Sequence, residues 1–257
     1  MFVRLIAAIT GTAVLWSSAP IVRAQATTGL PPELVTAIAK YAALTSYADT
    51  GTIVREAPGV VDRATTKAYF RQPTRDLYLE LHAVNSVNPG TRFTIDMSAT
   101  RSIVWMFNGD MQAYNFLTRR HERINAEGGG QVRALQNKSH ELQGVSMLIP
   151  SLLYSQSRLP GMISQIEQAT VAGIEDVDQR RCHKVVGVAA AYYPSGQQTN
   201  IRPVTVWIDA DTQLIRKVFE DTPEGYPAGS YQRTTITLQP QANPVLDDAK
   251  FQVTVPK

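Results

Sequence analysis

The sequence has almost no cysteine, since Cys182 is the single cysteine in 257 residues. One thiol cannot form an internal disulfide, and a chain of this length buries enough surface to fold without one. We expect the Cys182 side chain to be a small buried apolar group on a strand. It also lies too far from the N-terminus to carry the lipid of a bacterial lipoprotein. The sequence therefore predicts a chain that is not lipid-anchored.

An excess of charge of either sign is also missing. The chain holds 25 Lys and Arg against 22 Asp and Glu, a net charge of +3. Removing Arg4 and Arg23 with a leader leaves 23 basic against 22 acidic residues, or +1. The densest basic cluster, Arg119–Arg123, is short and typical of a solvated strand end or loop. No basic run marks a nucleic-acid-binding surface, so no nucleic-acid partner is predicted.

No apolar run is long enough to span a membrane. The longest, Leu5–Trp16, has twelve residues and would rise about 18 Å as a helix, against about 30 Å of hydrocarbon core. Ala24-Gln25-Ala26 has the pattern of a signal-peptide cleavage site, and cleavage after Ala24 is the alternative. Residues 1–26 are therefore predicted to be a cleaved secretory signal peptide. Residues 27–257 are predicted to form one periplasmic or secreted domain without a transmembrane span.

Catalytic and metal-binding motifs are missing as well. The sequence has no G-x-S-x-G, H-E-x-x-H, G-x-G-x-x-G or G-x-x-x-x-G-K-[ST] pattern. Its four histidines are scattered, and Asp209 with Asp211 offers fewer oxygens than Ca²⁺ needs. Cys182 and His183 are strand neighbours, so they should point to opposite faces. We therefore predict no catalytic residue, no metal and no cofactor; a secreted hydrolase would need a nucleophile–base pair that the sequence does not reveal.

A β-hairpin at Val204–Lys217 is the clearest pattern that is present. Val204, Val206 and Ile208 alternate with other residues and make one face apolar, and Asp209–Thr212 supplies turn residues. In the return strand, alternation predicts Leu214, Arg216 and Val218 on one face and Ile215, Lys217 and Phe219 on the other. Trp207 and Phe219 make the second face apolar too. Both faces of this hairpin should therefore be covered, by other elements or by a ligand.

Period-two patterns along most of the chain predict a sheet with helices. Residues 33–44 have helical spacing, and Asn108-Gly109 is a strong hairpin signal. Apolar segments broken by Pro150 and Pro160-Gly161 predict two or three short helices within 132–166. Strands are predicted at Thr52–Glu56, Ala64–Arg71, Arg75–Val84, Arg92–Met97, Ser102–Phe107, Met111–Leu117, Gln168–Asp176, Arg181–Ala190, Ile201–Ile208, Gln213–Glu220, Tyr231–Leu238 and Phe251–Val253. Short connections make the strands antiparallel, so we predict a single curved sheet with helices on its concave side.

Five segments carry a resemblance to a known family. They are Ala39–Tyr41 through Ser46–Gly51, Phe70–Arg75, Arg181–His183, Val206–Asp209 with Leu214–Lys217, and Asn243–Asp248 followed by Phe251 and Pro256. In order and spacing they resemble the periplasmic lipoprotein-carrier superfamily with the LolA/LolB-like fold, and more closely an uncharacterised secreted branch of it. The resemblance implies an unclosed β-barrel with helices plugging its concave side. It also implies an apolar cavity between sheet and helices that binds acyl chains in the best-known members.

These patterns and the resemblance together predict a soluble, non-catalytic periplasmic carrier or binding protein for a lipid or an acylated protein. The predicted lining residues are Trp105, Phe107, Met147, Leu148, Leu152, Leu153, Met162, Ile163 and Trp207, and plain core packing suits each of them too. The helices within 132–166 are expected to cover Trp207 and Phe219. The alternative is an envelope protein-interaction or sensing module on the same fold, with an interior filled by its own side chains and an envelope protein as its partner.

Overall fold

The structure is a computed structural model that describes residues 29–87, 101–124, 153, 166–192, 198–222, 225, 227 and 229–256. Its first half holds the helix α1 (Pro32–Ala42) and six strands. The strands are β1 (Ser46–Ala57), β2 (Val60–Arg71), β3 (Asp76–Val87), β4 (Arg101–Phe107), β5 (Asp110–Asn115) and β6 (Arg120–Ile124). The second half holds β7 (Ile166–Val177), β8 (Arg180–Tyr192), β9 (Gln198–Asp209), β10 (Ile215–Glu220), β11 (Arg233–Leu238), β12 (Gln241–Ala242) and the 3-10 turn η5 (Asp248–Lys250).

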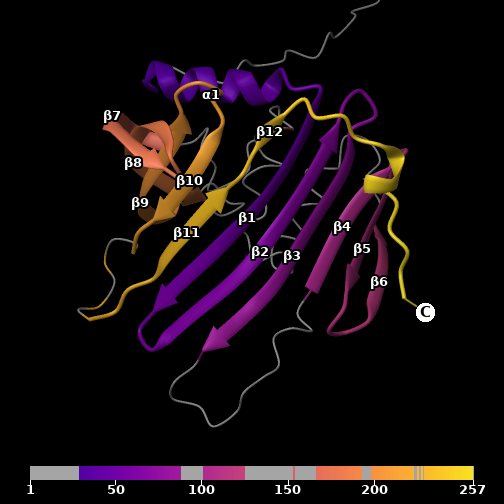
Figure 1. The fold of residues 1–257 in the computed structure, drawn as a ribbon. Coiled ribbons are helices and arrows are strands. Elements are labelled where there is room, and N and C mark those ends of the chain that lie inside the picture. The colour runs from indigo at the N-terminus through magenta and orange to yellow at the C-terminus, as the bar shows by residue number, and fades with distance from the viewer. Residues whose placement is uncertain are drawn as a thin grey trace, which may run out of the picture.

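The strands form one twelve-stranded antiparallel sheet that curves without closing (Figure 1). Its order is β6-β5-β4-β3-β2-β1-β11-β10-β9-β8-β7, and β12 pairs with β1. Two meanders therefore meet where β1 pairs with β11, and β6 and β7 are the open edges. This confirms the predicted fold class: mainly β, a single curved antiparallel sheet in the form of an unclosed barrel. Among the described residues, no helix is both long and apolar enough to cross a membrane.

α1 lies across one end of the sheet (Figure 1). Pro32 occupies the first turn, where its missing N–H costs no hydrogen bond. Glu33 near the start and Lys40 near the end suit the helix dipole. Leu34, Ala37 and Tyr41 recur on one face and are buried against the sheet. The helix predicted over 33–44 is thus confirmed, with its last turn ending at Ala42.

The strand predictions hold for most of the sheet and are wrong in places. Asn108 and Gly109 both have positive φ, 52° and 81°, as the predicted type I′ turn requires. β1 begins at Ser46, six residues before the predicted start. Arg120–Ile124 forms the exposed edge strand β6 in place of a strand end or loop. The strand predicted at Phe251–Val253 is wrong, since η5 leads there into an extended C-terminal segment.

Several predictions lie outside the described residues. These are the signal peptide at 1–26, the strand at Arg92–Met97, and the helices within 132–166 apart from Leu153 and the β7 residue Ile166. They stay predictions.

The predicted alternation in the return strand of the hairpin is wrong at one point. Ile208 pairs with Ile215 and Trp207 pairs with Lys217, so Arg216 forms a β-bulge between them. The extra residue turns Ile215 to the same face as Val218. Trp207 and Lys217 stay opposite one another on the other face. The apolar face of the hairpin therefore gains an isoleucine that strict alternation assigned to the outer side.

Candidate binding site on the concave face

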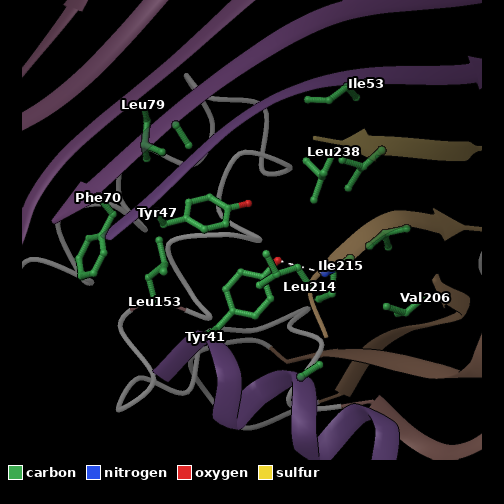
Figure 2. Close-up of a cluster of buried hydrophobic side chains, with 14 of the residues drawn as sticks. Tyr41, Tyr47, Ile53, Phe70, Leu79, Leu153, Val206, Leu214, Ile215 and Leu238 are labelled. Atoms are coloured by element: carbon green, nitrogen blue, oxygen red, sulfur yellow. Dashed lines mark hydrogen bonds between the residues drawn. The ribbon is translucent and has the colours of Figure 1, made fainter. Parts of the chain in front are cut away.

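The concave face of the sheet is lined by one continuous cluster of buried apolar side chains, here called the concave cluster. It draws members from α1, from β1 to β5, from β7 to β11, and from Leu153 (Figure 2). One cross-strand row shows its composition: Ile53, Ile236, Val218, Val206 and Val185 face each other on five neighbouring strands. Side chains at alternate positions share a face, so strand periodicity alone places this row inside.

A polar chain of two tyrosines and one aspartate interrupts the concave cluster. Tyr41 comes from α1, and Tyr47 and Asp49 come from alternate positions of β1. The Tyr47 hydroxyl donates to Asp49 Oδ2 at 3.0 Å, and the backbone N–H of Ile215 donates to the Tyr41 hydroxyl at 3.2 Å. The two rings lie 5.7 Å apart between centroids, and Figure 2 shows them facing each other between helix and sheet. Asp49 Oδ1 is buried and has no hydrogen-bond partner among the described residues.

Burial sets the protonation of these groups. It raises the pKa of the Asp49 carboxyl to about 7, and the hydrogen bond from Tyr47 offsets only part of that rise. Burial likewise raises the pKa of Tyr41 and of Tyr47 above the ordinary value, so both phenols stay protonated. Asp49 is thus a carboxyl group that titrates near neutral pH inside an apolar cluster.

A charged row marks the end of the concave face farthest from α1. Asp62, Arg55, Thr234 and Glu220 lie side by side on β2, β1, β11 and β10, two residues beyond the apolar row on β1. Arg202 of β9 acts electrostatically on both Arg55 and Glu220. Burial raises the pKa of Glu220 against the attraction of Arg202 and Arg55. Among the described residues, the concave face is therefore mainly apolar, with the buried group of Tyr41, Tyr47 and Asp49 near α1 and the charged row at the far end.

Of the nine residues predicted to line a cavity, the four that the structure describes lie on two faces of the sheet. Leu153 belongs to the concave cluster. Trp105 lies on the opposite, convex face with Tyr78, Ile103, Tyr114 and Phe251, and Phe107 packs against the same group, here called the C-terminal aromatic cluster. Trp207 is also on the convex face, in a third cluster. The remaining five, Met147, Leu148, Leu152, Met162 and Ile163, lie outside the described residues.

Among the described residues, Trp207 is covered by neighbouring strands, and the helices expected to cover it lie outside the described residues. The Trp207 indole packs with Val177 and Cys182, and Phe219 lies beside them. Its Nε1 donates to Glu175 Oε2 at 2.7 Å, and Lys217 Nζ lies 4.6 Å from its ring centroid. Long polar side chains can cover aromatic surface through their stems. Side chains of neighbouring strands therefore contribute to the cover of the second apolar face of the hairpin.

The described residues offer no metal or thiol chemistry. They contain no group of three or more His, Cys, Asp or Glu side chains able to hold a metal ion. Cys182 is fully buried, and burial raises the pKa of its thiol to about 11, which keeps it protonated and unreactive. On the convex face, Thr50, Thr52, Thr65 and Lys67 are among the residues that line an open, polar pocket of about 390 Å³.

Sequence reasoning missed Tyr41, Tyr47 and Asp49 as a group. The predicted helix over residues 33–44 includes Tyr41, and the first predicted strand begins only at Thr52, so Tyr47 and Asp49 fall in neither element. The available signal was the alternation of Tyr47, Asp49, Gly51 and Ile53, which continues the strand pattern backwards.

Comparisons with known proteins concern the fold only. No protein-family model matches the chain, and no curated protein is similar in sequence. Solved structures that match include the lipoprotein LppX of Mycobacterium tuberculosis, with 12% identity and a TM-score of 0.43 over 84% of this chain and 95% of that chain. LprF of Mycobacterium bovis matches with 15% identity and a TM-score of 0.39 over 89% of this chain and 98% of that chain.

A third match is the MucA/MucB complex of Pseudomonas aeruginosa, with 18% identity and a TM-score of 0.39 over 86% of this chain and 62% of that chain. All three matches lie below 20% identity and below a TM-score of 0.5. Similarity at this level carries no argument about what the chain binds.

Proposed function

We propose that this chain binds an acyl chain against the concave face, as a periplasmic or secreted carrier or binding protein for a lipid or an acylated protein. The observation that carries the proposal is the concave cluster, which runs across the sheet from β5 to β7 and ends at a charged row. An acyl chain laid along such a face gains about 0.8 kcal/mol for each buried CH₂. The signal peptide predicted at residues 1–26 supports the secreted location.

The charged row gives the site a direction. An amphiphile has an apolar tail and a polar head, and the concave face offers an apolar length and one charged end. The row carries Arg55 and Arg202 beside Asp62 and Glu220. The tail would lie under α1, and the head would lie toward the row. Nothing in this arrangement requires a catalytic group.

Uptake of a fluorescent fatty-acid probe by the purified mature protein tests the proposal. Native mass spectrometry of protein isolated from its own envelope should also show a lipid adduct. Leu153→Ala should weaken probe binding several-fold, because Leu153 lies in the concave cluster. Trp105→Ala is the matched control, since this buried residue lies on the convex face and its loss should leave affinity within about twofold. Absence of both an adduct and probe uptake would contradict the proposal.

The alternative, a protein-interaction or sensing module, has one observation in its favour. Side chains of the concave cluster are buried by the chain's own residues, as a self-filled interior requires. This alternative predicts no probe uptake, and crosslinking in the envelope should then recover one specific protein partner. Lipid that co-purifies without any specific crosslinked partner would exclude it.

A further inference from the structure

Asp49 is an exception on the concave face. Its neighbours at alternate positions of β1, Tyr47 and Ile53, belong to the concave cluster, whereas Asp49 places a carboxyl group there with 4% of its surface exposed. One oxygen accepts the Tyr47 hydroxyl, and Oδ1 has no partner among the described residues. Buried polar atoms in native proteins are nearly always hydrogen-bonded, because an unpaired one costs on the order of 1–3 kcal/mol. A spare buried acceptor therefore calls for an explanation.

We propose that Asp49 is the recognition point for a hydroxyl group of the bound amphiphile, which donates a hydrogen bond to Asp49 Oδ1. This inference rests on the proposed function and deepens it: the ligand class is a hydroxyl-bearing acyl lipid. The Tyr47 hydroxyl holds the other carboxylate oxygen, so Oδ1 is left as the acceptor for the ligand.

The surroundings favour a neutral hydroxyl over an ammonium group. A cation would have to be transferred into an apolar cluster, which costs far more than the transfer of a hydroxyl. A hydroxyl also both donates and accepts, so it suits a carboxyl whose pKa lies near neutral pH in either protonation state. The polar groups around Asp49 are Tyr47 on β1 and Tyr41 on α1, and Arg216 at the β10 bulge acts on Tyr41. Among these described groups, Asp49 is the one acid.

A pair of probes with the same acyl chain tests the inference: methyl 12-hydroxystearate, which carries one hydroxyl on its chain, and methyl stearate, which has none. Each competes with a fluorescent fatty-acid probe for the purified mature protein. The wild type should bind the hydroxylated ester on the order of tenfold more tightly, because hydrogen bonds to charged acceptors are stronger than those between neutral groups. Asp49→Leu should abolish the preference.

Asp49→Asn is the matched variant, because its amide can still form a hydrogen bond with a hydroxyl, as acceptor or as donor, and should keep most of the preference. Equal affinity of the wild type for both probes would overturn the inference and leave the proposed function standing. Retention of the preference in Asp49→Leu would overturn it too. Failure of both probes to bind the wild type would overturn the proposed function itself. The wild-type comparison decides the matter even where a variant fails to fold.

Discussion

Two buried aspartates, one on each face of the sheet, have opposite surroundings. Asp76 at the start of β3 lies on the convex side, has no exposed surface, and accepts hydrogen bonds from Arg71 Nη2 at 2.6 Å, Thr74 Oγ1 at 2.6 Å and the N–H of Asn108 at 3.0 Å. Asp49 on the concave side accepts a single one among the described residues, from Tyr47. Both carboxylate oxygens of Asp76 accept hydrogen bonds, whereas Asp49 Oδ1 accepts none among the described residues.

The pKa values of the two groups separate for that reason. Burial alone would raise the pKa of Asp76, but the hydrogen bonds from Thr74, Arg71 and Asn108 lower it below the ordinary value. Burial raises the pKa of Asp49 to about 7 because one hydrogen bond cannot offset it. Asp76 completes a structural joint: Arg71 also pairs with Asp248 at 2.7 Å and stacks on Phe251. Asp76 and Arg71 on the convex face therefore hold the C-terminal segment in place. On the concave face, Asp49 Oδ1 has no hydrogen-bond partner among the described residues.

The largest effect should come from a matched pair of phenylalanines. Phe70 on the concave face and Phe251 on the convex face are 1% and 0% exposed, so each change to Ala should lower the free energy of unfolding by about 3–5 kcal/mol. Urea unfolding measures both losses. Only Phe70→Ala should also weaken binding of the fatty-acid probe. An equal loss of binding in Phe251→Ala would erase the functional distinction between the two faces.

Asp76→Asn should cost less, about 2 kcal/mol near neutral pH, because it weakens charge-assisted hydrogen bonds that an amide cannot match. The lowered pKa of Asp76 determines how its contribution to the free energy of unfolding changes with pH. The carboxylate's contribution is present above the unfolded-state pKa of about 3.9 and is lost as pH falls through the folded value. The gap between wild type and variant, measured by urea unfolding, should therefore close in acid. Asp248→Asn is the control: its carboxylate is largely exposed and should contribute less than about 1 kcal/mol.

Asp49 should show the opposite pH dependence. Its folded pKa of about 7 lies above the unfolded value, so the native state holds a proton that the unfolded chain has lost. Stability should fall as pH rises from about 4 to about 7, by on the order of 1 kcal/mol per pH unit, and level off above. Asp49→Asn removes this titration. Urea unfolding at pH 5, 6, 7 and 8 gives the difference in free energy of unfolding between wild type and Asp49→Asn. This difference should change steadily from pH 5 to pH 7 and stay constant above pH 7. A flat difference would show that Asp49 ionises freely in the fold.

The sheet could be predicted from alternating apolar residues, because successive side chains of a strand point to opposite faces. Short turns such as Asn108-Gly109 fixed the antiparallel order. Alternation of apolar residues does not show which face of a sheet is concave. For this reason the sequence predicts Trp105, Phe107 and Trp207 on the same face as Leu153. Large aromatic side chains on an outer face look the same in sequence as those inside. Here the C-terminal segment covers Trp105, through contacts between residues more than a hundred positions apart.

Asp49 was not predictable as a site for a different reason. Nothing in Ser46–Gly51 states that its acidic residue will be buried, because burial depends on contacts between distant residues. The ring of Tyr41 on α1 lies 5.7 Å from that of Tyr47, the hydrogen-bond partner of Asp49. The bulge at Arg216 was equally hidden. It serves the fold by letting Arg216 Nε reach Asp209 Oδ2 at 3.0 Å, while Thr212 and Asp211 donate their N–H groups to the same carboxylate. These hydrogen bonds of Asp209 accompany the local register at the bulge, and the alternation of apolar residues does not predict that register.

The smallest effect should come from the convex cover of Trp207. Lys217 Nζ lies 4.6 Å from the ring centroid, and a cation above an indole at a partly exposed site is worth about 0.5–1 kcal/mol. Lys217→Met keeps the stem that packs on the ring and removes the charge. A double-mutant cycle with Trp207→Leu, measured by urea unfolding, should return a coupling of that size. Binding of the fatty-acid probe should not change, because Lys217 and Trp207 face away from the concave cluster. Zero coupling would mean that packing alone covers the indole, and a loss of probe binding would place the ligand on the convex face.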